Sequence, residues 1–143
     1  MKLKIALLLC SLLVLLSCNS NLSKTEIDKS RINDILDQIT DQFIAYNINS
    51  IMTCYHQDYY HKSYDKDEQK TIWLDRRSQY NLMQIENLTI EINDNRAVAK
   101  FVLKYSNENG EDIFVEPEDI GDLSYFIKEN NEWKIYGNQL EHK

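Results

Sequence analysis

The apolar residues of this chain change their spacing once, after residue 81, and that change limits the folds available to it. Up to Tyr80 they recur every three or four residues, as on one face of a helix. From Leu88 onward they recur at every second residue, as on one face of a strand. Helices followed by a meander of antiparallel strands predict an α+β fold, with N-terminal helices packed in a curved antiparallel sheet.

The longest helix is expected over residues 25–47. Ser23 and Glu26 have the spacing of a capping box at its start. Its apolar stripe consists of Ile32, Ile35, Leu36, Ile39, Phe43 and Tyr46. A stripe this wide is typical of a helix that covers a sheet, and a partner-binding helix is the alternative.

Two further helices are expected. Asn49 and Ser50 can cap a short helix that carries Ile51, Met52 and Tyr55. Asp67 can cap a helix over residues 68–81, in which Ile72, Trp73, Arg76 and Tyr80 share one face. The aromatic and polar segment 56–69 between them has room for one or two brief strands.

The second half of the chain predicts five strands separated by turns. Leu88 to Ile92 and Ala97 to Tyr105 alternate around the turn signal Asp94-Asn95, which indicates a long hairpin. Residues 107–112 are expected to form a loop. Short strands should follow, with these alternating residues: Ile113 and Val115 before Pro117; Leu123, Tyr125 and Ile127; Trp133, Ile135 and Gly137 after an Asn130-Asn131 turn.

The N-terminus has the order of an export signal. Lys2 and Lys4 precede an apolar stretch that is too short to span a bilayer, and it ends in Leu15-Leu16-Ser17-Cys18. This ending resembles the bacterial lipobox, whose cysteine receives a diacylglyceryl group and whose new amine is often acylated as well, with fatty acids such as palmitate. Two or more acyl chains anchor a protein stably. An ordinary secretory signal is the alternative.

The lipobox resemblance implies three segments: a signal peptide over 1–17, the lipidated Cys18 with a polar tether over 18–27, and one domain over 28–143. It also implies attachment to a membrane of the bacterial cell envelope, the outer membrane in a Gram-negative cell. Removal of Lys2 and Lys4 changes the totals of 16 basic and 23 acidic side chains to 14 and 23, a net charge of −9. Such a charge argues against nucleic acid as a partner. Only Cys54 would keep a free thiol.

Two stretches carry a second resemblance. "SYFIKENNEWKIYGNQ" (124–139) is similar to the final hairpin of many NTF2-like proteins, and "AYNINSIMTCYHQDYY" (45–60) resembles their second helix and the aromatic segment after it. The superfamily includes SnoaL-like and ketosteroid-isomerase-like proteins. The resemblance implies a cone whose bent sheet wraps around the long helix and leaves a pocket at its open end. Members bind small molecules there, catalyse isomerisation or cyclisation, or do no chemistry, so fold alone does not give function. The oligomeric state stays open, and a dimer is compatible with the sequence.

In enzymatic members an acid or base follows the second helix and faces the cavity. Asp58 or His61 occupies that place here, with Tyr60 beside them as a possible hydroxyl donor. The alternative is that the histidines are exposed and the tyrosines pack under the sheet. No cofactor is expected, and no metal, because strand alternation puts His56 and His61 on opposite faces.

Two further features are interpreted as structural. The acidic segment 116–122 is expected to be a solvated loop, since it lacks the ligand spacing of a calcium site. Cys54 is expected to be a small buried hydrophobe.

Two functions from different classes fit the sequence. The first is a non-catalytic cell-envelope module that binds a small molecule, a peptide or a protein, and this is the one we favour. The second is an isomerase, cyclase or dehydratase that uses a cavity acid or base. An acid or histidine that converges with a tyrosine in the cavity would favour the enzyme, whereas a cavity filled by aromatic and aliphatic side chains would favour the module.

Overall fold

The structure, a computed structural model, describes residues 22–140. The expected signal peptide and Cys18 lie outside these residues. The described residues contain three helices: α2 (Lys24–Ile44), α3 (Ile48–Met52) and α4 (Lys66–Gln79). Two strands of two residues each, β1 (Tyr60–His61) and β2 (Tyr64–Asp65), pair between α3 and α4, as the aromatic segment suggested.

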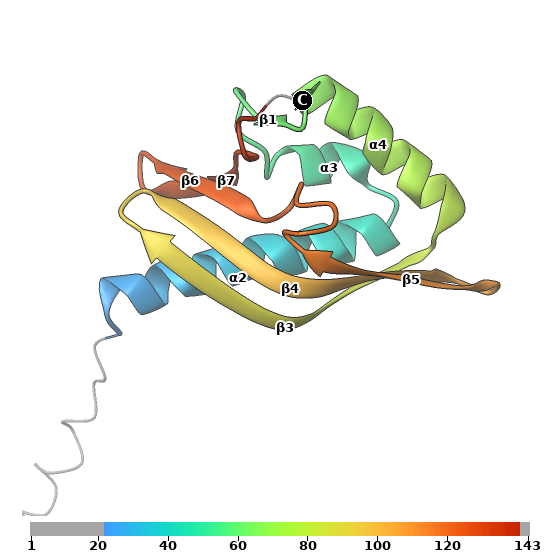
Figure 1. The fold of residues 1–143 in the computed structure, drawn as a ribbon, viewed down its shortest axis with the longest axis horizontal. Coiled ribbons are helices and arrows are strands. Elements are labelled where there is room, and N and C mark those ends of the chain that lie inside the picture. The colour runs from blue at the N-terminus through green and yellow to red at the C-terminus, as the bar shows by residue number, and fades with distance from the viewer. Residues whose placement is uncertain (1–21, 141–143) are drawn as a thin grey trace, which may run out of the picture.

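Helix α2 forms the centre of the fold and lies along the sheet (Figure 1). Ser23 caps it by accepting a hydrogen bond from the backbone N–H of Glu26, at 3.2 Å. The apolar stripe as far as Phe43 is core rather than a free binding face, because Ile39 and Phe43 have no exposed surface, whereas Tyr46, expected to belong to it, is 60% exposed. The helix begins within the segment expected to be tether and ends at Ile44, three residues earlier than expected. It ends there because Tyr46 has a positive φ of 59°, which no helix continues.

The caps of the two shorter helices lie two residues before the expected positions. Asn47, not Asn49 or Ser50, caps α3 and accepts from the N–H of Ser50. Asp65, not Asp67, caps α4 and forms a reciprocal capping box with Glu68. The extended backbone of Asp65 (φ −85°, ψ −176°) lets its carboxylate accept two backbone N–H groups at the helix start.

The five-stranded antiparallel sheet has the order β3-β4-β6-β7, and β5 also pairs with β4. Its strands are β3 (Leu82–Asn93), β4 (Arg96–Asn107), β5 (Gly110–Glu116), β6 (Tyr125–Glu129) and β7 (Glu132–Ile135). The long hairpin and its Asp94 turn are confirmed, while the loop expected over 107–112 is shorter because β5 starts at Gly110. A bulge between Glu86 and Thr89, where Asn87 has a φ of 56°, bends β3.

One edge of β4 is shared by two strands. β6 pairs with Arg96 to Val98 near the start of β4, and β5 pairs with Phe101 to Asn107 near its end. Residues 117–124, which join β5 to β6, therefore lie where the two strands part. This junction faces α4 and the β1–β2 pair, and it forms the candidate site below.

The first helix and the last strands are joined directly. Asp28 of α2 is 4% exposed, and both of its carboxylate oxygens accept hydrogen bonds from Lys128 of β6, at 2.6 and 2.8 Å. Arg31 donates to the backbone carbonyl of Asn131 at 3.3 Å. In β6 Ile127 is buried as expected, but Phe126 takes the core position expected for Tyr125, because its register with Ile135 puts it on the face of the core.

Trp133 gives a spectroscopic check of the last strand. Its side chain is 3% exposed and that of Ile135 is fully buried, as their alternation predicts, and both residues of the Asn130-Asn131 turn have positive φ. In a Trp73→Phe background we expect Trp133 fluorescence to be blue-shifted and resistant to iodide quenching. Emission that is red and readily quenched would show that the register of β7 is wrong.

Candidate functional site

The segment 116–122 is not a solvated acidic loop. Glu118 and Asp119 are exposed as expected, but Glu116 is 1% exposed and Asp122 is 2% exposed. The prediction of a solvated loop was wrong because hydrogen-bond donors pair with both buried carboxylates: backbone N–H groups with Glu116, and α4 side chains with Asp122. Both face the junction between β5, β6 and α4.

Glu116 holds the segment in place. Its carboxylate accepts hydrogen bonds from the backbone N–H groups of Ile120, at 3.1 Å, and of Gly121. The hydroxyl of Ser124 donates to the same carboxylate at 3.4 Å. Gly121 has a φ of +78°, and a Cβ there would come within 2.9 Å of the carbonyl oxygen of Pro117. A side chain at this position would force the backbone away from Glu116.

Asp122 is paired with α4. Its Oδ2 atom accepts hydrogen bonds from the Arg76 guanidinium and from the Gln69 side-chain amide, both at 2.6 Å. The hydroxyl of Tyr59 in turn donates to Gln69 Oε1 at 3.1 Å. Gln69 and Arg76 are seven residues apart on α4, and therefore lie two turns apart on the same helix face.

Aromatic side chains surround this pair. The Arg76 guanidinium lies 5.3 Å from the centre of the Trp73 ring and 5.7 Å from that of Tyr105. Trp73 donates a hydrogen bond to the hydroxyl of Tyr55 at 2.9 Å. Trp73, Tyr55 and Tyr105 are at most 2% exposed, so they fill the interior of the cone around the polar cluster.

Burial and neighbouring charges shift the pKa values of Glu116 and Arg76. Burial raises the pKa of Glu116, and the nearby charge of Asp122 raises it further. Hydrogen bonds from the backbone of Gly121 and Ile120 lower it in part, and the resulting pKa is about 7. For Arg76, burial favours the neutral form, but the Asp122 carboxylate outweighs it and raises the pKa above its ordinary value. Arg76 therefore stays charged, while Glu116 titrates near neutral pH.

Two buried oxygen atoms of the cluster make no hydrogen bond with any described residue. They are Oδ1 of Asp122 and the hydroxyl oxygen of Tyr105. Buried polar atoms in folded proteins nearly always have a partner, whether protein, water or ligand. Of the two residues, only Asp122 lines a pocket, so its Oδ1 atom is the acceptor that a ligand can reach.

A pocket of about 180 Å³ reaches the cluster from the surface. His61, Lys62 and Tyr64 form one side, Gln69, Ile72 and Arg76 of α4 form the second, and Asp119, Ile120 and Asp122 form the third. Among its lining residues Gln69, Asp122 and His61 are buried, and Asp122 is paired with Arg76. This pocket is the candidate functional site.

The three residues suggested by the sequence do not converge. His61 lines the pocket and is 3% exposed, but Nε2 donates to the carbonyl of Ile120 at 2.8 Å and Nδ1 accepts from the N–H of Asn138 at 3.2 Å. Its ring is therefore neutral and fully engaged. Burial also lowers the pKa of His61. Asp58 is an exposed residue, and Tyr60 is half-buried and does not line the pocket.

The other candidates have structural positions. His56 is buried and bonds Glu129 at 3.1 Å, rather than being exposed. Within residues 22–140, no three His, Cys, Asp or Glu side chains are grouped closely enough to hold a metal ion. Cys54 is 4% exposed, as expected for a small buried hydrophobe, and burial raises the pKa of its thiol.

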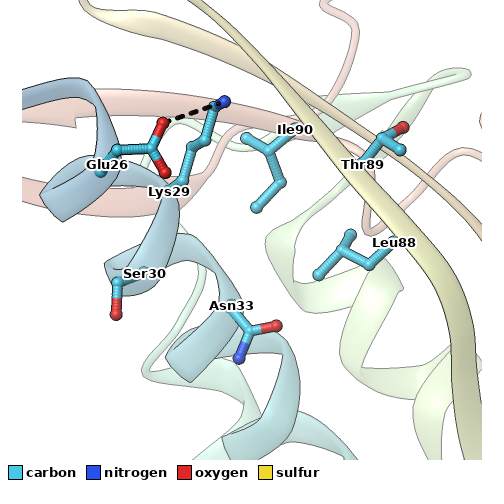
Figure 2. Close-up of a pocket in the computed structure, with 7 residues that line it drawn as sticks. All are labelled: Glu26, Lys29, Ser30, Asn33, Leu88, Thr89 and Ile90. Carbon is cyan, nitrogen blue, oxygen red and sulfur yellow. Dashed lines mark hydrogen bonds and ion pairs between the residues drawn. The ribbon is translucent and has the colours of Figure 1, made fainter.

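A larger hollow, of about 540 Å³, lies between α2 and β3. Figure 2 shows Leu88 and Ile90 of β3 facing α2, on which Glu26 and Lys29 form an ion pair of 3.4 Å. Among its lining residues Lys29 donates to Glu26 and Asn33 donates to Asp37 one turn along α2, and no buried side-chain polar atom of this lining lacks a partner. We therefore place the candidate site at the smaller pocket beside Asp122.

The residues missed from the sequence are Glu116, Asp122, Gln69 and Arg76. One signal was present, because Arg76 shares a predicted helix face with Trp73. A cation that is buried on such a face needs a partner, for which an acid is the usual choice. The sequence does not identify that acid, which lies 46 residues further on.

The buried glutamate predicts a pH dependence of stability. In the unfolded chain its pKa is near 4.5, and in the folded state it is about 7. Between these values the folded state binds a proton that the unfolded state does not, so stability falls as pH rises. From pH 5.5 to 8 the free energy of unfolding should fall by about 2 kcal/mol through Glu116 alone.

Urea unfolding at both pH values, for the wild type and Glu116→Gln, measures this. His61 acts in the opposite direction, because its lowered pKa makes the folded state less stable at acid pH. The difference between the two proteins isolates Glu116. If the glutamine variant shows the same pH dependence as the wild type, Glu116 does not titrate in this range.

Comparison with known proteins identifies the fold. No protein-family profile matches the chain, and a search of curated proteins found no match. Among solved structures, an NTF2-like protein of unknown function from Pseudomonas putida KT2440 aligns with a TM-score of 0.62 at 12% identity, covering 78% of this chain and 84% of its own. At this identity the likeness shows the fold alone, and the fold is the NTF2-like cone, as the resemblance implied.

Two other solved structures also align with this chain. A candidate scytalone dehydratase from Novosphingobium aromaticivorans has a TM-score of 0.57 at 12% identity, with 79% and 82% of the two chains covered. Bd1075 from Bdellovibrio bacteriovorus has a TM-score of 0.62 at 16% identity and covers 81% of this chain. The present chain spans only 42% of Bd1075, so the comparison concerns one part of that protein.

Proposed function

We propose that this NTF2-like chain is a lipid-anchored protein of the bacterial cell envelope that binds a small molecule, without catalysis, in the pocket beside Asp122. The lipobox-like ending at Cys18 supports the anchor. Within residues 22–140 no helix is long and apolar enough to cross a membrane. A pocket lined by buried polar groups with one unused acceptor supports binding.

The observation that carries the non-catalytic assignment is the engagement of the acids and the histidine. Glu116 accepts from backbone N–H groups, Asp122 Oδ2 accepts from Arg76, and both ring nitrogens of His61 are bonded. A general acid or base must reach a proton of the substrate directly or through one water. The rest of the described interior is filled by aromatic and aliphatic side chains.

A dehydratase-like enzyme is the second candidate. A carboxyl group with a pKa of about 7, such as Glu116, is suited to accept and release protons at neutral pH. One structural neighbour is a candidate scytalone dehydratase. In this alternative, Glu116 would have to leave its backbone donors during the reaction.

One experiment separates the two functions. The protein without residues 1–18 is screened against a library of small polar fragments by ligand-observed NMR, and the spectra of bound fragments are followed for hours. Binding without change of the fragment signals supports the module. New product signals that disappear in Glu116→Gln would establish the enzyme, and the absence of any bound fragment at the pocket would reject both.

The anchor has its own test. In Cys18→Ser the hydroxyl cannot replace the thiol as acceptor of the diacylglyceryl group, since oxygen is the weaker nucleophile at neutral pH. We expect an unprocessed precursor that lacks acyl mass, and a wild-type protein found in the membrane fraction. Mass spectrometry of the wild-type N-terminus decides the question, and a mature protein without acyl groups would refute the anchor.

A further inference from the structure

We propose that the pocket beside Asp122 selects compact, uncharged ligands that end in an amide group, whose N–H donates to Asp122 and whose carbonyl accepts from Arg76. This inference rests on the proposed binding function and deepens it. It concerns the chemical class of the ligand, on which neither the fold nor the comparisons bear.

Asp122 offers the pocket an acceptor that no described residue uses. Asp122 is 2% exposed, lines the pocket, and its Oδ1 atom makes no hydrogen bond with any described residue. A carboxylate oxygen accepts hydrogen bonds and cannot donate them. Leaving it unpaired is costly in a buried position, so a ligand that supplies an N–H or O–H group gains affinity there.

The Arg76 guanidinium offers donors beside this acceptor. A guanidinium carries five N–H groups, and Arg76 donates one of them, to Asp122 Oδ2. Its side chain is 14% exposed, and Trp73 and Tyr105 flank it. The pocket therefore presents N–H donors and a carboxylate acceptor side by side. An amide offers the complementary pair, one carbonyl acceptor next to N–H donors.

The charges at the floor of the pocket favour an uncharged ligand. Arg76 and Asp122 neutralise each other at 2.6 Å, and at the rim Lys62 lies beside Asp119, to whose backbone carbonyl it donates at 3.0 Å. At the Arg76–Asp122 pair, a carboxylate or ammonium ligand would lose its hydration without finding a free counter-charge. A neutral amide loses less hydration and makes the same hydrogen bonds.

The volume of the pocket favours a compact ligand. A volume of about 180 Å³ is below the roughly 300–1,000 Å³ of pockets that enclose drug-sized molecules. Ile72 and Ile120 add apolar wall next to the polar floor. The pocket therefore fits an amide with a short branched aliphatic group, or the end of a longer ligand that extends into solvent.

Four probes of nearly equal shape test this class. Isobutyramide has the complete amide, isobutyrate is its anionic counterpart and isobutylamine a cationic one. Methyl isopropyl ketone keeps the carbonyl but replaces the NH₂ with a methyl group. Each is titrated into ¹⁵N-labelled protein without residues 1–18, and the amide signals of Gln69, Arg76, Ile120 and Asp122 are followed.

We expect isobutyramide to shift these signals in a saturable way, with a Kd in the millimolar range. Each of the other three probes should bind about tenfold more weakly, because each loses one hydrogen bond to a charged group or brings an unpaired charge. The ketone tests the bond to Asp122 without any mutation. Asp122→Asn should reduce the preference for the amide over the ketone, while Glu118→Gln, an exposed change in the same loop with the same charge difference, should not.

The outcomes separate this inference from the proposed function. Equal affinity for the amide and the ketone, or stronger binding of either charged probe, would overturn the amide class while leaving the binding function intact. Fragments of another class that occupy the pocket when isobutyramide does not would do the same. Failure of the entire fragment library to bind the pocket would remove the function itself. If Asp122→Asn does not fold, the ketone comparison alone decides.

Discussion

Replacing Arg76 with methionine is expected to lower the free energy of unfolding by about 3 to 5 kcal/mol. The substitution keeps a flexible apolar chain against Trp73 but removes the only cation bonded to Asp122 among the described residues. The carboxylate, 2% exposed, would then be buried without a counter-charge. Chemical denaturation at pH 7 measures the loss, and Arg31→Met, which changes an arginine whose side chain is half exposed, should cost less than about 1 kcal/mol.

The double variant Arg76→Met/Asp122→Asn tests the cause. If the cost comes from an isolated buried charge, neutralising Asp122 should restore much of the stability, since asparagine still accepts from Gln69. A double variant as unstable as the sum of the two single changes would place the cost in lost packing of Arg76 against its aromatic neighbours instead.

Phe43→Ala should also cost about 3 to 5 kcal/mol. The ring has no exposed surface and lies 5.8 Å from the Trp73 ring centre and 5.4 Å from that of Tyr105. Large rings on both sides limit the collapse of the cavity that alanine would leave. The next residue provides the control, because Ile44 is 44% exposed and its change to alanine should have a small effect. A denaturant midpoint equal to that of the wild type for Phe43→Ala would show that this helix face is not core.

Local periodicity predicted much of the fold. Three helices and the long hairpin follow from spacing alone, because burial of one face imposes it. The caps were misplaced by two residues because Asp65 and Asp67, or Asn47 and Asn49, have equal capping chemistry. The choice between them depends on backbone angles that the adjoining turns determine.

The candidate site could not be predicted in the same way. Residues 116–122 contain four acids, a proline and a glycine, a composition typical of exposed loops. Two of the acids are buried because β5 and β6 separate along one edge of β4 and bring their connection under α4. That arrangement depends on pairing between strands and on a cation 46 residues earlier, so no local window of sequence contains it.

The bond between Asp28 and Lys128 also bears on how the chain acquires its structure during synthesis. The two residues are 100 positions apart, and α2 has its contacts with β6 and β7 only when both strands are present. A ribosome adds about 5 to 20 residues per second, so Lys128 follows Asp28 by about 5 to 20 seconds. During that interval the apolar face of α2 lacks part of its cover. The contacts of α2 with β3 can form once residue 93 has been made, so only the part of α2 that meets β6 and β7 must wait until synthesis of the domain is nearly complete.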